Sequence, residues 1–254
     1  MKRYELIDTL RGLEILSMIA FHTCWILSHF GFFILPETLV GTGFTVWERS
    51  ICIGFISIAG FSFSLGHDHV RSGLIVFGWG FVITLVTCLF LPDIRIIFGI
   101  LTFLGTSIFI MIPLDGAIRK ITKGSRAACM VIFALSMVLF LLTYRINVGY
   151  IGLASFSRKL PEWLYRNLVT TFIGFMMPGF FSTDYFSLIP WFFMYLCGYM
   201  LHKIVADTKV SEYIMKLKIP GINKLGRHSL PIYIIHPIVL YILIGALSYC
   251  MRGR

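Results

Sequence analysis

Residues 12–34 read GLEILSMIAFHTCWILSHFGFFI, and Glu14 is the one Asp, Glu, Lys or Arg among them. A helix needs about 20 apolar residues to cross the hydrocarbon core of a bilayer. The stretch is therefore long enough to be a membrane-spanning helix. A cleaved signal peptide has a short, uninterrupted apolar segment. Because Glu14 interrupts this one, we expect the segment to be retained as the first span.

The composition extends this interpretation to the whole chain. Of the 254 residues, 57% are hydrophobic and 13% are charged, whereas soluble domains are about 45–50% apolar and about 25% charged. These values exclude an ordinary soluble enzyme, a disordered chain and a disulfide-rich secreted domain. The six cysteines lie in or beside apolar runs without paired spacing. We therefore expect neither a disulfide framework nor a metal site.

Further apolar runs of spanning length follow the first one. Together they are residues 12–34, 50–66, 73–91, 96–114, 127–144, 185–202 and 229–249. A weaker run, 164–177, contains Arg166 and is bounded by Pro161 and Pro178. The predicted fold class is an all-α polytopic membrane helix bundle of about seven transmembrane helices plus one interfacial or re-entrant helix. We expect a single domain over residues 1–254.

The basic residues predict the orientation. The net charge is +10, and the Lys and Arg residues are spread between the apolar runs, which argues against a nucleic-acid-binding surface. Cytoplasmic loops are enriched in Lys and Arg. An N-terminus inside and a C-terminus outside places most of them on the cytoplasmic side of a cell membrane. Counting 164–177 as a span would move the basic residues of 203–227 outside, so we leave it unspanned in an outer loop.

Polar residues of the first span share one helix face. Arg11 and His22 are eleven residues apart, which is about 20° from a whole number of turns. Steps of three and four add four residues to this face: Glu14, Met18, Trp25 and His29. Asp8 lies one turn before Arg11 and can pair with it or cap the helix. A rise of about 1.5 Å per residue places His22 roughly 16 Å beyond Arg11, near the midplane.

The last span has a similar polar face. Ser229, Tyr233 and His236 follow one another at steps of four and three, and they either hydrogen-bond between helices or serve a site. Arg227 at the start of this run either holds an anion or follows the positive-inside rule. Asp184 precedes the sixth run, at its outer mouth.

Five segments resemble one family in their order along the chain. They are IDTLRGLEILSMIAFH, FISIAGFSFSLG, ITLVTCLFLPDIRIIFGILTFLG, GFFSTDYFSLIPW and GRHSLPIYIIHP, and they cover about residues 4–240. The family is that of the heparan-alpha-glucosaminide N-acetyltransferase catalytic domain. Its wider relatives, the membrane acyltransferases of polysaccharides, carry an Arg followed after ten residues by a His in their first helix. Arg11 and His22 match that pattern.

The resemblance implies acetyl-CoA, or another acyl-CoA, as the cytosolic donor, and a sugar amine or hydroxyl on the other side as acceptor. On this hypothesis His22 is the base, because a histidine pKa suits proton transfer near neutral pH. Two further candidate catalytic residues, which can donate to the oxyanion, are Tyr233 and His236. The candidate donor-binding residues are Arg11, Arg227 and Ser229. The candidate acceptor-binding residues are Asp8, Trp25, His29 and Asp184.

The residues leave other interpretations open. Direct transfer and a covalent acyl-histidine intermediate are not separated. The polar face of the first span is also typical of a proton or anion relay in a transporter. A non-catalytic membrane scaffold would use the same side chains for helix packing. A homodimer is a further expectation that the residues do not decide.

Overall fold

The computed structural model describes residues 4–32, 41–153 and 156–252. Two compact units make up the chain. The first unit is Met1–Ile58 together with Val205–Arg254, and the second is Ala59–Ile204. The expectation of a single domain stays a prediction.

Seven helices of the described residues are long and apolar enough to cross a membrane. They are α1 (Glu5–His29), α3 (Thr42–Phe63), α4 (His69–Phe90), α5 (Ile100–Thr122), α6 (Arg126–Thr143), α8 (Leu188–Val205) and α11 (Ser229–Arg252). The hydrocarbon core offers no water to backbone N–H and C=O groups, so apolar runs satisfy them within a helix. The predicted all-α polytopic bundle is confirmed.

The shorter elements connect these helices. They are η1 (Pro92–Ile94), η2 (Ile146–Val148), β1 (Tyr150–Ile151), β2 (Arg158–Lys159), η4 (Glu162–Leu164), α7 (Leu168–Ile173), α9 (Lys209–Lys216) and α10 (Ile222–Arg227). The weak run 164–177 contains one helix, α7, which has six residues and is about 9 Å long. It is too short to cross a bilayer, and leaving this run unspanned is confirmed.

Helix boundaries differ from the apolar runs because other groups satisfy the backbone. The fourth run was expected to begin at 96, but α5 begins at Ile100. Before it, the N–H of Ile97 donates to Oγ of Ser182 at 2.9 Å, and the N–H of Phe186 donates to the carbonyl of Phe98 at 2.9 Å. These bonds hold the connecting chain out of a helix.

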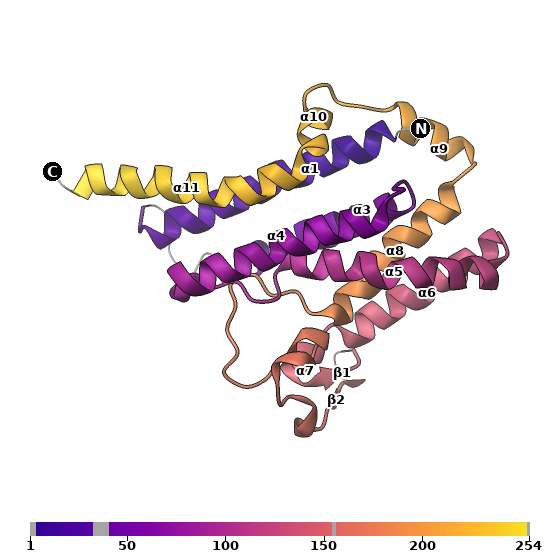
Figure 1. Ribbon diagram of the computed structural model, residues 1–254, viewed down its shortest axis with the longest axis horizontal. Coiled ribbons are helices and arrows are strands. Elements are labelled where there is room, and N and C mark those ends of the chain that lie inside the picture. The colour runs from indigo at the N-terminus through magenta and orange to yellow at the C-terminus, as the bar shows by residue number, and fades with distance from the viewer. Residues whose placement is uncertain (1–3, 33–40, 154–155, 253–254) are drawn as a thin grey trace. The chain divides into compact units, whose positions relative to one another are not determined.

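In the first unit, α10 lies against α1, and α11 then runs beside α1 in the same direction (Figure 1). Glycines permit the approach of α10. A Cβ on Gly12 would overlap the carbonyl oxygen of Ile222, and a Cβ on Gly226 would overlap the carbonyl oxygen of Asp8. The two backbones are therefore in direct contact, which determines where α11 starts relative to α1.

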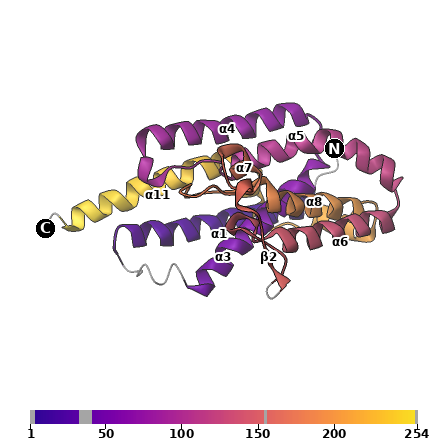
Figure 2. The same ribbon diagram turned by 90° about the horizontal axis from the view of Figure 1, so that it is seen from below.

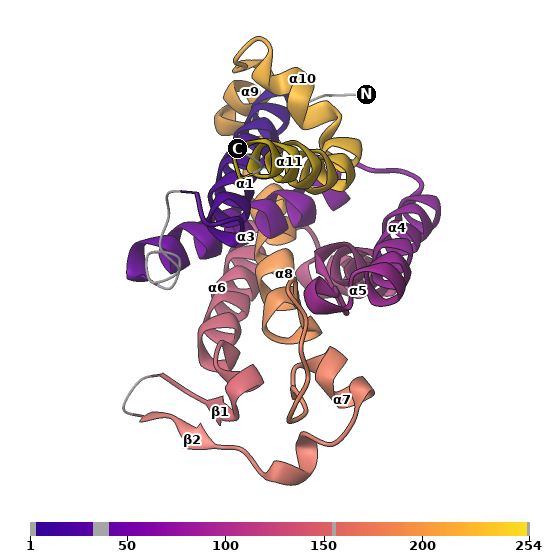
Figure 3. The same cartoon turned by 90° about the vertical axis from the view of Figure 1, so that its left-hand side faces the viewer.

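In the second unit, α4 and α5 lie side by side (Figure 2). Here too a glycine allows close contact, because a Cβ on Gly80 would lie 2.6 Å from the backbone nitrogen of Thr102. The β1–β2 hairpin and α7 follow the C-terminal end of α6 and precede α8 (Figure 3). Tyr165 ties this region together by donating to the carbonyl of Ile146 at 2.7 Å.

A polar cluster joins α5 and α8 within the second unit. The hydroxyl of Tyr199, which is fully buried, donates to Asp115. The same carboxylate pairs with Arg119 at 2.9 Å and with Lys203 at 3.7 Å. None of these four residues was among the predicted site residues, although Asp115 and Arg119 have the i,i+4 spacing of a helical ion pair.

Candidate functional site

The central feature of the first unit is a contact between two histidines on α1 and α11. Nδ1 of His22 lies 2.7 Å from Nε2 of His236. The two rings are nearly parallel, with an interplanar angle of 4° and centroids 5.0 Å apart. His236 is 7% exposed. Two predicted site residues, separated by more than 200 positions in the sequence, therefore form one hydrogen-bonded pair.

A second contact explains why these histidines meet. Nη1 of Arg11 donates to the carbonyl of Gly226 at 3.4 Å. From there, His22 lies eleven residues along the chain from Arg11, and His236 lies ten residues from Gly226. His22 is thus roughly 16 Å along α1 from Arg11, while the chain beyond Gly226 ends α10 at Arg227 and begins α11 at Ser229. Because α1 and α11 run in the same direction, both imidazoles reach the same depth.

Pro237 shapes the helix around His236. Proline has no N–H, so it cannot donate to the carbonyl of Tyr233 four residues earlier. Nδ1 of His236 lies 3.0 Å from the carbonyl oxygen of Ile232. The imidazole is thereby held on both sides, by its own helix and by His22.

An apolar cluster lies beside the pair, because its members Phe21 and Tyr233 contact the rings of His22 and His236. Its buried members are Ile15, Met18 and Ile51, and Tyr233 packs against them. The Tyr233 ring lies 5.9 Å from the His236 ring, edge to face. Tyr233 therefore lies close enough to share a site with the two histidines.

The predicted donor-binding arginines are paired with carboxylates. Nη1 of Arg11 lies 3.2 Å from Oδ1 of Asp8, which confirms the pairing expected for Asp8. Arg227 donates to both carboxylate oxygens of Glu5, at 2.9 and 3.0 Å, and its Nε lies 3.5 Å from Asp8. Two carboxylates balance two guanidinium groups. Glu5 was not among the predicted site residues, although the sequence places it three residues before Asp8 in the acidic first turn of the same helix.

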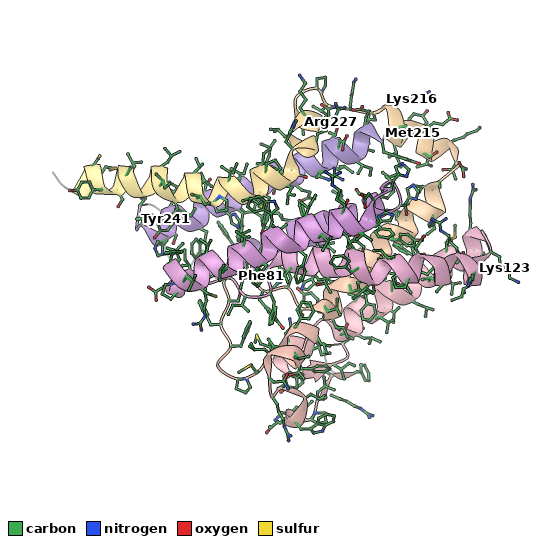
Figure 4. The ribbon with its side chains drawn as sticks, viewed as in Figure 1. Phe81, Lys123, Met215, Lys216, Arg227 and Tyr241 are labelled. Carbon is green, nitrogen blue, oxygen red and sulfur yellow. The ribbon has the colours of Figure 1, made fainter. Side chains whose placement is uncertain are left out.

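The far end of α1 carries aromatic contacts. The rings of Trp25 and His29 are stacked, with centroids 5.7 Å apart and an interplanar angle of 9°. The His29 ring also lies 6.0 Å from that of Tyr241, which Figure 4 labels on α11. Tyr241 was not among the predicted site residues, although it lies five residues beyond His236 on the same helix. His29 itself is exposed.

Residues 3–238 match the family described as heparan-alpha-glucosaminide N-acetyltransferase, catalytic. The chain belongs to this family. No curated protein and no solved structure matches it. The resemblance noted in the sequence is confirmed, and heparan-alpha-glucosaminide N-acetyltransferase membership implies a membrane acetyltransferase-like activity.

Two further candidate residues of this N-acetyltransferase-family chain belong to different units: Ser229 to the first and Asp184 to the second. Ser229 is the first residue of α11 and is half-buried. Asp184 belongs to the second unit, where its Oδ2 accepts from the N–H of Ile100 at 3.1 Å. That bond satisfies one of the free donors at the start of α5. The acceptor-binding role of Asp184 stays a prediction, and the structure gives the side chain a capping contact.

One further ionisable residue of the predicted polar face, Glu14, turns toward α3. A Cβ on Gly54 would overlap Oε1 of Glu14, so the carboxylate rests against the glycine backbone. Nearby, Nε1 of Trp47 donates to Oγ of Ser17 at 2.8 Å. The face predicted as one continuous stripe is therefore divided: Arg11 and His22 contact α10 and α11, whereas Glu14 contacts α3.

Proposed function

We propose that the chain is an acyl-CoA-dependent membrane acyltransferase with His22 as its general base. The donor is cytosolic acetyl-CoA or another acyl-CoA, and the acceptor is a sugar amine or hydroxyl on the extracytoplasmic side. Family membership supports the transferase class. The observation that carries the assignment of His22 is its hydrogen bond to His236 inside the spanning helices.

The proposed reaction is nucleophilic attack on a thioester. The acceptor nitrogen or oxygen forms a bond to the carbonyl carbon while His22 accepts its proton. The carbon–sulfur bond then breaks, and His22 returns the proton to the coenzyme A thiolate. The products are the acylated acceptor and free coenzyme A. No redox step or metal ion is required by this balance.

The tetrahedral intermediate needs a donor for its oxyanion. Tyr233 is proposed for this role because its ring lies next to His236 and a phenol can donate a hydrogen bond. The sequence also predicted His236 as a hydrogen-bond donor to the oxyanion, but its Nε2 is hydrogen-bonded to Nδ1 of His22.

The donor's phosphates are proposed to bind near the N-terminal ends of α1 and α11. Arg11 and Arg227 lie there, and Ser229 is two residues beyond Arg227. Guanidinium groups bind phosphate through charge-assisted hydrogen bonds. The phosphates would compete with Glu5 and Asp8 for the two arginines, so donor binding would exchange one set of ion pairs for another.

The acceptor is proposed to approach from the opposite end of α1. Stacked Trp25 and His29 offer aromatic surfaces at that end. Aromatic faces suit the apolar faces of sugar rings, and the exposed His29 ring can hydrogen-bond a hydroxyl. The proposed orientation has the N-terminus in the cytoplasm and follows from the distribution of Lys and Arg.

The test uses purified protein reconstituted in liposomes, with labelled acetyl-CoA and a panel of amino sugars and glycans. His22→Gln is expected to lower acyl transfer by about 100-fold or more, because general-base catalysis is worth about 10²–10⁴ in rate. His67→Gln is the matched control, because His67 is exposed and belongs to the second unit, whereas His22 belongs to the first. Wild-type transfer by a folded His22→Gln protein contradicts the assignment, and solute flux without acyl turnover in the wild type contradicts the transferase proposal.

A further inference from the structure

The hydrogen bonds around the histidine pair determine which nitrogen of His22 can accept a proton. A carbonyl oxygen only accepts, so Nδ1 of His236 must carry the hydrogen that bonds the Ile232 carbonyl at 3.0 Å. In a neutral imidazole the other nitrogen is then an acceptor. Nε2 of His236 therefore accepts from Nδ1 of His22, 2.7 Å away.

We infer that His236 is a positioning residue that holds His22 in its Nδ1–H tautomer. This leaves the lone pair of His22 on Nε2, where it is the proton acceptor of the proposed reaction. The inference rests on the proposed function only for that last step. The order of the bonds, from Ile232 carbonyl to His236 to His22, follows from the donor and acceptor chemistry of each group.

The hydrogen bond between His22 and His236 also stabilises the protonated form of His22 after proton transfer. When Nε2 of His22 takes the acceptor's proton, the ring becomes an imidazolium whose Nδ1–H still faces an acceptor on His236. A charged ring forms a stronger hydrogen bond than a neutral one. His22 is half-buried and His236 is buried beside Tyr233, so the bond between the two rings orients the base without a bridging water.

Two variants of His236 separate positioning from packing. His236→Gln keeps a side-chain oxygen that can accept from His22, whereas His236→Leu keeps bulk and loses the acceptor. Fixing the wrong tautomer is costly, up to about 10⁴-fold in the best-known triad. We expect His236→Leu to lower kcat by about 100-fold or more, with the KM for acetyl-CoA changed little, and His236→Gln to recover most of kcat.

A readout independent of activity is the ¹⁵N spectrum of imidazole-labelled protein, in which the His22 signals are those missing from His22→Gln. The expected wild-type pattern is a protonated Nδ1 and an unprotonated Nε2, and His236→Leu should lose this preference. A wild-type His22 protonated on Nε2 overturns the inference, as does unaltered kcat in His236→Leu. Absence of acyl transfer with the expected tautomer would instead contradict the proposed function alone.

A different observation, the exposed face of α9, carries a second inference. Val210, Tyr213 and Leu217 recur at helical spacing and are 54%, 75% and 58% exposed. Lys209 and Lys216 flank this stripe. They are seven residues apart, about two turns, and therefore lie on the same side of the helix; Figure 4 labels Lys216. The opposite side contains buried Ser211 and turns toward the protein.

The position of α9 indicates what covers this stripe. The helix packs on α1, and the N–H of Ile219 just beyond it donates to Oγ1 of Thr9 at 3.3 Å. Helix α9 is therefore level with the N-terminal end of α1, where a spanning helix leaves the hydrocarbon. Lysines beside exposed apolar side chains are typical of helices that lie in the membrane interface and attract anionic lipids.

We propose that α9 binds the bilayer surface, with its apolar stripe among the acyl chains and its lysines on anionic headgroups. The segment is basic: Lys209, Lys216, Lys218 and Lys224 stand against Glu212 between residues 209 and 224. Each lysine near an anionic surface strengthens membrane binding through its attraction to the headgroups. A purely zwitterionic surface would lack this contribution.

Hydrogen exchange of the full chain in lipid nanodiscs tests this proposal. Amides of 209–217 should exchange several-fold more slowly in nanodiscs with phosphatidylglycerol than in phosphatidylcholine alone, and added salt should reduce the difference. The combined Lys209→Gln and Lys216→Gln protein should lose it, while Lys120→Gln with Lys123→Gln, on the other unit, should keep it. Equal exchange in both lipids, or no effect of the first pair, overturns the proposal.

Discussion

Nη2 of Arg227 lies 2.9 Å from Oε1 and 3.0 Å from Oε2 of Glu5, so the end of α10 is tied to the first turn of α1. This ion pair lies at the point where the chain returns to α1 before entering α11. It therefore helps to determine the register that places His236 against His22. Its loss should reach the candidate site through the helices rather than by direct contact.

Arg227→Ala is expected to lower the midpoint temperature of thermal unfolding, because it removes the charge-assisted hydrogen bonds to Glu5. Thermal unfolding in detergent or nanodiscs measures the change. Lys224→Ala, an exposed position on the same helix, is the control and should lie within about 0.5 kcal/mol of wild type. Exchanging the two charges, with Glu5→Arg and Arg227→Glu together, should recover part of the loss.

Arg11→Ala tests the proposed phosphate contact. One charged hydrogen bond to a phosphate is worth about 1.5 kcal/mol, so the KM for acetyl-CoA should rise about tenfold with little change in kcat. Titration of initial rates against donor concentration measures this. An unchanged KM together with lower thermal stability would contradict the phosphate contact and leave Arg11 with a structural role, such as its contacts with Asp8 and Gly226.

Gly226→Ala should separate α10 from α1, because the added Cβ would overlap the carbonyl oxygen of Asp8. A rigid backbone atom cannot move aside as a flexible side chain can, so we expect destabilisation of about 1–3 kcal/mol. Gly116→Ala is the matched control, since nothing lies within 4 Å of its Cβ position. In a helix alanine is favoured over glycine by about 1 kcal/mol. Equal stability of both variants would contradict the close contact.

Asp184→Ala should lower stability by about 0.5–2 kcal/mol, the usual cost of a lost helix cap, because Oδ2 accepts from the N–H of Ile100. Asp184→Asn keeps an acceptor oxygen and should cost less. Thermal unfolding separates the two, with the exposed Asp93→Ala as control. If Asp184→Asn instead leaves stability intact but raises the KM for the acceptor, the charge binds substrate as the sequence predicted.

Because of Tyr185, the stability of the folded protein is expected to fall at alkaline pH. Burial raises the pKa of its hydroxyl from 10.0 to about 12, and the protonated group donates to the carbonyl of Thr171 at 2.5 Å. The folded protein thus holds this proton more tightly than the unfolded chain. Its contribution is complete below pH 10 and is lost as the pH rises toward 12. Over that interval the wild type should lose stability faster than Tyr185→Phe in urea titrations; parallel curves would contradict this.

The apolar runs predicted the seven spanning helices because the hydrocarbon core leaves a backbone no other way to satisfy its polar groups. They did not predict the helix ends. Hydropathy marks the part of a helix that lies in lipid, whereas the helix continues through polar residues beyond it. This is why α3 begins at Thr42 and α5 ends at Thr122.

Helical periodicity predicted that Arg11 and His22 share a face, and the structure places both toward α10 and α11. It could not predict their partners. Periodicity gives the angle of a side chain around its own helix, but not which other helix lies opposite. For that reason Glu14 was assigned to the same face although it contacts α3.

The sequence by itself determined the class of this protein, the number of its spans and the presence of polar side chains within them, because these depend on residue type and spacing alone. Only the tertiary structure decided that His22 meets His236 and that Arg227 meets Glu5. Those contacts join positions more than 200 residues apart, and their register is determined by the glycine-mediated contact between α10 and α1. A difference of one residue in that contact would turn the imidazoles about 100° away from each other.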